Sequence, residues 1–374
     1  MRAEAAALDA LLGQRLVVCV GTGGVGKTTA AAALGVAAAL RGRSVAVITV
    51  DPSRRLKDAL GLEGLSSEPR RVPLENGAGT LDALALDTKR TFDRLIARVA
   101  PRPDVAERIF ANRLYQELSS ELGGSAEYMA MEKLHELIEL QRYQLIVVDT
   151  PPSADVRELL SAPLRMTELL ASQAVDFLKA PAAIITGTES SLMRMTLATV
   201  IRALERWTGL TLLGELADFA AGFEHLVDGF RARAAAIDRA LRAPDTSFAI
   251  VTTLEPSIVS ATLAFDRELR RADFPIAGII ANRVYDFPAL APNAGARAPA
   301  ALRRKLRDSY ADFAALTARD AAALAALAAQ ASAPLLAALP LFEEAPASLA
   351  GLRNVASLLG GRSPGALRRP RRAP

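Results

Sequence analysis

A glycine-rich stretch near the N-terminus holds the residues with the clearest chemical potential. Residues 21–29 read GTGGVGKTT and match G-x-x-x-x-G-K-[ST], the pattern of phosphate-binding loops. Its glycines let successive backbone N–H groups point at phosphate oxygens, and the following helix adds its positive N-terminal end. In this pattern Lys27 reaches the β- and γ-phosphates, and the Thr28 hydroxyl binds Mg²⁺. The predicted nucleotide-binding residues of the loop are Gly21, Thr22, Gly23, Gly24, Val25, Gly26, Lys27, Thr28 and Thr29. A plain glycine-rich turn between a strand and a helix is the alternative.

The segments around this loop alternate between short apolar runs and helical patterns, which predicts an α/β fold with a mostly parallel sheet flanked by helices. Most of the strands are too apolar for one-sided exposure, so we expect both faces of the sheet to be covered. Strands are expected at 15–20, 44–50, 82–87, 144–149, 247–253, 276–281 and 335–339. Helices are expected near 27–41, 53–60, 88–100, 104–121, 126–141, 257–272, 298–330 and 346–359.

Two aspartates follow strands of this expected sheet. Asp149 ends the apolar strand YQLIVVD, which is typical of the second Mg²⁺-associated element of phosphate-loop enzymes. Asp51 follows the second strand, where ligands bind in parallel sheets. Asp51 either positions or deprotonates the attacking water, or it binds Mg²⁺ through water. Capping of the helix that starts near Ser53 is the structural alternative for Asp51, and both roles can hold together.

The charge and the cysteine content of the chain limit which partners, metal sites and cellular locations we expect. The chain has 374 residues and a formal net charge of +4, of which five arginines lie in residues 362–374, so the rest of the chain has a net charge of −1. The high pI is therefore no sign of a DNA-binding body, and we expect no specific nucleic-acid partner. A single cysteine, Cys19, excludes an internal disulfide and makes a Cys-based metal site in one chain very unfavourable. No signal peptide is visible, and we expect a cytoplasmic protein.

The alternation of strands and helices breaks between residues 155 and 245, where only amphipathic helical patterns occur. We therefore expect a core formed by 1–154 and 246–360, with a helical insertion over 155–245 that the helices of 88–141 could join. The remaining residues, 361–374, are rich in arginine and proline and are expected to form a disordered basic tail.

With these residues in hand, the chain resembles the ATPase family of the arsenite pump and of the targeting factor for tail-anchored membrane proteins. The loop ending GGVGKTT is similar to that family's variant, DPSRRLKDAL from Asp51 resembles its first switch, and DTPPS from Asp149 resembles its second. Weaker similarities place Asn282 and Pro340 where the family contacts adenine. The resemblance covers roughly residues 15–360.

This resemblance implies a phosphate-loop NTPase that uses ATP and Mg²⁺, with Lys27 and Asp51 as catalytic residues and Thr28, Asp51 and Asp149 around the metal. It also implies a dimer that ATP closes and hydrolysis opens. In the targeting branch, closure forms a helical groove that shields the transmembrane helix of a client. The insertion at 155–245 is the matching candidate here, and the partner is an apolar client helix or a membrane-associated protein.

The chain departs from the family pattern at three points. The second lysine of the loop, which neutralises phosphate charge across the dimer, is replaced by Thr22. The zinc-binding C-x-x-C pair and the arsenite-site cysteines have no counterpart, so we expect neither a zinc site nor an arsenite site. A slow ATPase, a heterodimer whose partner supplies the charge, and compensation by Arg54 or Arg55 all remain open. A weakly hydrolysing regulatory or scaffold subunit is the alternative function, and a partitioning-type ATPase is a more distant one.

Overall fold

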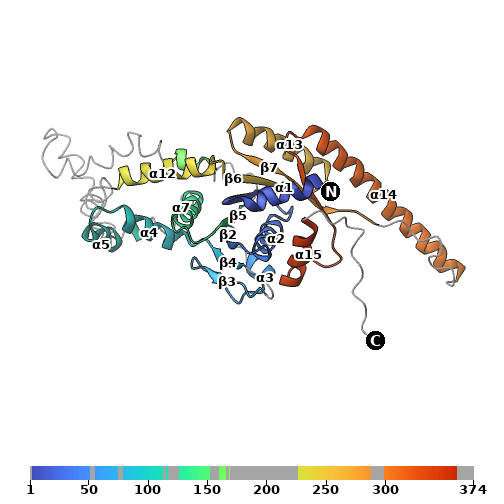
Figure 1. Cartoon of the computed structure of the whole chain (residues 1–374), viewed down its shortest axis with the longest axis horizontal. Coiled ribbons are helices and arrows are strands. Elements are labelled where there is room, and N and C mark those ends of the chain that lie inside the picture. Colours follow the sequence, from blue (N-terminus) through green and yellow to red (C-terminus); the bar gives the residue numbers. More distant parts are fainter. Residues whose placement is uncertain are drawn as a thin grey trace, which may run out of the picture. The chain divides into compact units, whose positions relative to one another are not determined.

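The chain forms two compact units, each described here by itself. In the computed structural model the described residues are 2–50, 55–74, 79–112, 115–116, 126–151, 160–165, 168, 226–287 and 299–359. One unit, the α/β unit, comprises residues 1–85, 140–156 and 242–374. The other comprises residues 86–139 and 157–241, and we call it the helical unit after its described elements (Figure 1). Most of the insertion expected over 155–245 lies outside the described residues.

The α/β unit is built on an eight-stranded sheet of order β3-β4-β2-β5-β1-β6-β7-β8. Every neighbouring pair is parallel except β3 with β4. The strands are β1 (Leu16–Val20), β2 (Ser44–Thr49), β3 (Arg70–Arg71), β4 (Thr80–Ala85), β5 (Leu145–Asp149), β6 (Thr246–Thr252), β7 (Ile276–Val284) and β8 (Leu335–Pro340). The expected mostly parallel α/β sheet flanked by helices is confirmed.

Strand positions agree closely with the apolar runs of the sequence, but β7 ends at Val284, three residues after the expected end at 281. Two further differences concern β4 and β3. The strand expected at 82–87 is β4, which begins at Thr80 and ends at Ala85, two residues earlier. The chain leaves the sheet there because Asp87 caps helix α4 (Thr88–Val99), accepting a hydrogen bond from the backbone N–H of Arg90 at 3.0 Å. The short antiparallel strand β3 was not expected, since two exposed arginines carry no strand pattern.

Helix α2 (Lys27–Leu40) follows the glycine-rich loop and packs closely against the sheet. Its sequence is dominated by alanine, and eleven of its fourteen residues are buried. A Cβ atom added at Gly35 would lie 2.4 Å from Cγ2 of Val47 on β2 and 3.3 Å from Cδ1 of Leu81 on β4. Small side chains therefore let α2 approach the strands more closely than a helix with ordinary side chains could.

The remaining helices of this unit complete its core. Helix α15 packs against α2 and β8, α13 packs against β6 and β7, and α14 packs against β7. No helix in the described part of the chain is both long enough and apolar enough to cross a membrane. The bounds are α1 (Arg2–Gly13), α3 (Arg55–Ala59), α13 (Pro256–Arg271), α14 (Ala300–Gln330) and α15 (Leu349–Leu359).

The described part of the helical unit contains α4, α5 (Pro103–Ala111), α7 (Ala126–Glu139) and α12 (Val227–Leu241). The sequence predicts one helix over 104–121, but α5 ends at Ala111 because Asn112 adopts an extended conformation. The side chain of Asn112 then accepts a hydrogen bond from the backbone N–H of Tyr115 at 3.2 Å. An asparagine that bonds to the backbone in this way competes with helix continuation.

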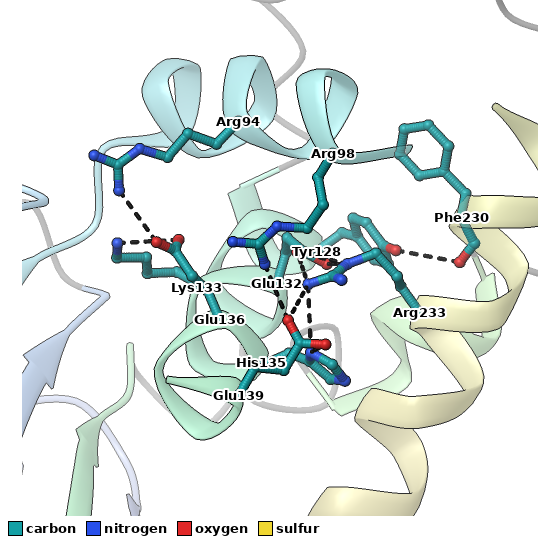
Figure 2. Close-up of polar contacts among 10 residues, drawn as sticks. All are labelled: Arg94, Arg98, Tyr128, Glu132, Lys133, His135, Glu136, Glu139, Phe230 and Arg233. Atoms are coloured by element: carbon teal, nitrogen blue, oxygen red, sulfur yellow. Dashed lines mark hydrogen bonds and ion pairs between the residues drawn. The ribbon is translucent and has the colours of Figure 1, made fainter. Parts of the chain in front are cut away.

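Arg233 of α12 is the centre of a charged network that joins α12 to α7 (Figure 2). Its Nε donates to both carboxylate oxygens of Glu132, at 2.7 and 2.8 Å, and an NH2 group lies 3.3 Å from Glu139. Arg98 of α4 joins the same network through Glu139 at 3.0 Å. Removing one partner of a largely buried pair leaves an uncompensated charge, so this network is expected to fix the relative placement of the three helices.

His135 makes this network sensitive to pH. Its Nδ1 lies 3.3 Å from the guanidinium of Arg233 and 3.5 Å from Glu139. Burial and then Arg233 lower the pKa of His135, although Glu139 acts in the opposite direction and Arg98 adds to the lowering. Near the ordinary pKa of 6.5, the unfolded chain therefore binds a proton at this histidine more readily than folded His135 does. The stability that neutral, buried His135 contributes to the fold is present above about pH 6.5 and is lost as the pH falls below that value.

We expect the melting temperature of the full chain to fall more between about pH 7.5 and pH 5.5 in the wild type than in His135→Gln. Burial also raises the pKa of Glu132, and its titration changes stability in the opposite direction. Because Glu132 is present in both proteins, the difference between them isolates His135. Differential scanning calorimetry at matched ionic strength provides the measurement. An equal fall in the two proteins would mean that His135 does not titrate between the folded and unfolded states.

Candidate nucleotide-binding site

The glycine-rich loop connects β1 to α2, and its backbone requires glycine at several positions. Gly21, Gly24 and Gly26 have positive φ angles of 151°, 76° and 98°. A Cβ atom at Gly21 would lie 2.1 Å from the carbonyl oxygen of Val251, and one at Gly26 would lie 2.2 Å from Nδ2 of Asn282. Gly26 is the N-cap of α2, so the first free N–H groups of that helix face the loop. This is the backbone arrangement that binds phosphate in loops of this type.

Lys27 lies in the first turn of α2, and its side chain folds back over the loop. Its Nζ donates to the carbonyl oxygens of Gly21 at 3.0 Å and Thr22 at 2.9 Å, and the residue is only 7% exposed. The ammonium group is thus held beside the loop amides, where it can pair with phosphate oxygens. The hydroxyl of Thr22 is buried and has no hydrogen-bond partner among the described residues.

The ends of three neighbouring strands bring Asp149 close to the loop. Asp149 pairs in register with Cys19 of β1 and Thr49 of β2, and the Thr49 hydroxyl donates to its Oδ2 at 3.0 Å. The next residue, Thr150, donates through Oγ1 to the carbonyl oxygen of Cys19 at 2.7 Å. This edge lies directly before the phosphate loop, because β1 ends at Val20.

Asp149 and Lys27 both act electrostatically on the thiol of Cys19, the residue before the last of β1. Burial and then the charge of Asp149 raise the pKa of the Cys19 thiol well above its ordinary range, and the charge of Lys27 acts to lower it. Cys19 is fully buried, so it remains a neutral thiol. A carboxylate at this strand end and the hydroxyl of Thr28 are both oxygen donors, which is the donor type that Mg²⁺ prefers. The residues present therefore fit a magnesium ion.

A cavity of about 550 Å³ opens beside the loop. It has three cationic side chains in its lining, those of Lys27, Arg55 and Arg283, and one anionic side chain, that of Asp58. Such an excess of positive charge favours an anionic ligand. The other lining residues are Gly24, Gly26, Thr28, Thr29, Ala59, Thr150, Ala345, Pro346 and Ala347.

The structure brings together some of the predicted site residues and leaves others away from the cavity. Asn282 donates from Nδ2 to the carbonyl oxygen of Val25 at 2.8 Å, which attaches β7 to the loop. Pro340 is the last residue of β8 and pairs with Val284, and it is not among the described residues that line the cavity. Asp51 and Arg54 lie outside the described residues.

Sequence reasoning missed Arg283, Asp58 and residues 345–347, which line the cavity without belonging to the phosphate-loop pattern. Asp58 had a usable signal, since it lies in the segment that resembles the first switch. Arg283 and residues 345–347 carry no pattern that indicates a site. Their places depend on the backbone beyond β7 and β8, which composition and periodicity do not specify.

Residues 14–293 match the family model described as anion-transporting ATPase. Among similar proteins, one named ATPase get3 from Aspergillus terreus is 30% identical over 158 residues, which cover 42% of this chain and 45% of that protein. Protein Rv2184c of Mycobacterium tuberculosis is 33% identical over 159 residues, covering 40% and 37%. ATPase GET3 of Malassezia globosa is 29% identical over 147 residues, covering 39% and 42%. The matched segment thus spans less than half of the length of each of these relatives.

Proposed function

The chain belongs to the family of anion-transporting ATPases, and from that premise we propose that it binds Mg²⁺ and ATP at residues 21–29 and hydrolyses the ATP. The observation that carries this proposal is the placement of Lys27 and Thr28 in one cationic cavity at the start of α2. The relatives named ATPase GET3 support the same reaction class.

The proposed roles in ATP binding and hydrolysis belong to backbone and side-chain groups of the loop and of the neighbouring strand ends. The loop N–H groups bind phosphate oxygens, and Lys27 exchanges its bonds to Gly21 and Thr22 for bonds to the β- and γ-phosphates. Thr28 and Asp149 hold Mg²⁺, which neutralises charge on the phosphates when bound. Asp51 positions or deprotonates the attacking water, or it acts on the metal through water.

The adenine end of the site is proposed at Asn282 and Pro340. The Nδ2 of Asn282 donates to the loop carbonyl of Val25. Its Oδ1 is an acceptor, which suits the exocyclic amino group of adenine and does not suit the O6 of guanine. A preference for ATP over GTP is therefore part of the proposal.

We further propose that the protein works as a dimeric switch whose helical part binds an apolar client or a membrane-associated partner. This proposal rests on the resemblance of the loop and of the two switch segments to the targeting branch of the family. In this proposal residues 1–154 and 246–360 form the ATPase core, residues 155–245 form the client-binding insertion with help from 88–141, and 361–374 form a basic tail. The dimer is either a homodimer or a pair with a homologous subunit, in the cytoplasm.

Thr22 favours a second candidate, a weakly hydrolysing regulatory subunit of such a pair. Threonine cannot supply the positive charge that the family's second loop lysine provides, and a missing cation at a transferring phosphoryl group lowers turnover by roughly 10³-fold or more. Robust turnover by the purified chain alone, measured as phosphate release from ATP, would eliminate this second candidate.

Restoring the charge with Thr22→Lys is expected to raise ATP turnover by at least about tenfold, because a lysine there can neutralise phosphate charge. Phosphate release at saturating Mg²⁺ and ATP gives the measurement. Thr22→Gln, which adds a longer side chain at the same position without a charge, is the matched control and is expected to give no gain. A wild-type rate equal to that of Thr22→Lys would show that the chain does not need this cation.

A further inference from the structure

Arg283 occupies an unusual place in the sheet. It lies in β7, but its φ of 58° is in the left-handed region, which non-glycine residues seldom adopt. The pairing of β7 with β8 shifts register between Ala281 and Val284, so a bulge contains Arg283. Bulges of this kind redirect a side chain and are common beside functional sites. Arg283 is exposed between the buried residues Asn282 and Val284.

Arg283 is one of the residues that line the cavity beside the phosphate loop. Gly24, Gly26, Lys27 and Thr28 line the same cavity. The neighbouring Asn282 donates to the carbonyl oxygen of Val25, and its Nδ2 lies 2.2 Å from where a Cβ of Gly26 would be. The bulge is therefore held against the loop through Asn282, and this holds the backbone of Arg283 beside the loop.

We propose that Arg283 is an additional phosphate-binding residue, whose guanidinium pairs with oxygens of the nucleotide's phosphate chain within the same subunit. This inference rests on the proposed nucleotide site. A guanidinium presents donors in a planar fork that matches phosphate oxygens. It also remains charged at every relevant pH, which suits a loop in which Thr22 provides no charge.

The backbone of Arg283 provides a way to separate binding from folding. A left-handed arginine is strained by about 1 kcal/mol, and glycine at the same position is not. Relief of this strain is offset by the conformational entropy that glycine adds to the unfolded chain. Arg283→Gly should therefore remove the guanidinium with little change in the free energy of unfolding.

The test compares the affinities of ATP, ADP and adenosine for wild type, Arg283→Gly and Arg283→Lys by isothermal titration calorimetry. Arg283→Gly should bind ATP about 10- to 100-fold more weakly than the wild type. Its affinity for ADP should fall less, and its affinity for adenosine should not change. Arg283→Lys should recover part of the loss for ATP. The melting temperature of Arg283→Gly should stay close to that of the wild type.

Asp273→Gly is the matched control, since Asp273 also has a left-handed φ, of 57°, and is not among the described residues that line the cavity. It should relieve similar strain and leave all three affinities unchanged. Unchanged ATP affinity in Arg283→Gly would overturn this inference and leave the proposed function standing. An equal loss of affinity for adenosine would also overturn it, because that loss would place the guanidinium against the base. Failure of the wild type to bind ATP would overturn both this inference and the proposed function.

Discussion

Lys27→Ala is expected to lower ATP turnover by at least about 10³-fold and to remove measurable ATP binding at micromolar protein concentration. The ammonium group lies within hydrogen-bond reach of two carbonyl oxygens of the phosphate loop, so no other described lysine can replace it at that point. Phosphate release and calorimetric titration with ATP give the two measurements.

The same substitution should leave the fold intact, because two hydrogen bonds to carbonyl oxygens contribute only about 1 kcal/mol each. Lys305→Ala provides the control, since Lys305 lies exposed on α14. That variant should keep wild-type binding and turnover. Normal ATP binding by Lys27→Ala would show that nucleotide binds somewhere other than residues 21–29.

Gly21→Ala is expected to destabilise the chain by roughly 2–4 kcal/mol, the largest single effect on folding that we predict. The new Cβ would lie 2.1 Å from the carbonyl oxygen of Val251 and 3.2 Å from its carbonyl carbon. Both belong to the backbone of β6, which cannot move aside without disturbing its pairing with β1. The positive φ of Gly21 adds backbone strain.

Gly24→Ala is the natural comparison, because Gly24 also has a positive φ but no atom lies within 4 Å of its would-be Cβ. It should lose only the conformational contribution, about 1 kcal/mol. Urea unfolding of the two variants and the wild type, followed by circular dichroism, gives the difference. Equal losses would indicate that the loop can shift away from β6.

The strands that surround the site could be predicted from the sequence because each is a short, mostly apolar run. β1, β2, β5 and β6 are fully or almost fully buried, and their bounds lie within one residue of the expected ones. The expected ends of β4 and α5 were wrong, because single side chains that bond to the backbone decide where these elements end. Asp87 ended β4 early by capping α4, and Asn112 ended α5 before the expected helix was complete.

The same division holds for the site. The position of the loop between β1 and α2 could be predicted from its fixed spacing of residue types, and that of Asp149 from the apolar run it ends. The position of Arg283 could not, because it depends on a bulge that arises from the pairing of β7 with β8. The sequence similarity at this point marked Asn282 alone, and nothing in it assigned a role to the side chain of Arg283.

The close fit of α2 to the sheet has a consequence for which substitutions the chain can accept. The N-terminus of α2 carries Lys27 and Thr28, so any shift of this helix also shifts the phosphate loop. A larger side chain at Gly35 would meet Val47 and Leu81 and push the helix outward by a fraction of an ångström or more. Side-chain volume on this helix therefore sets the height of the loop amides above the strand ends. A larger side chain at Gly35, about two turns along α2 from Lys27, should consequently alter the loop without touching it.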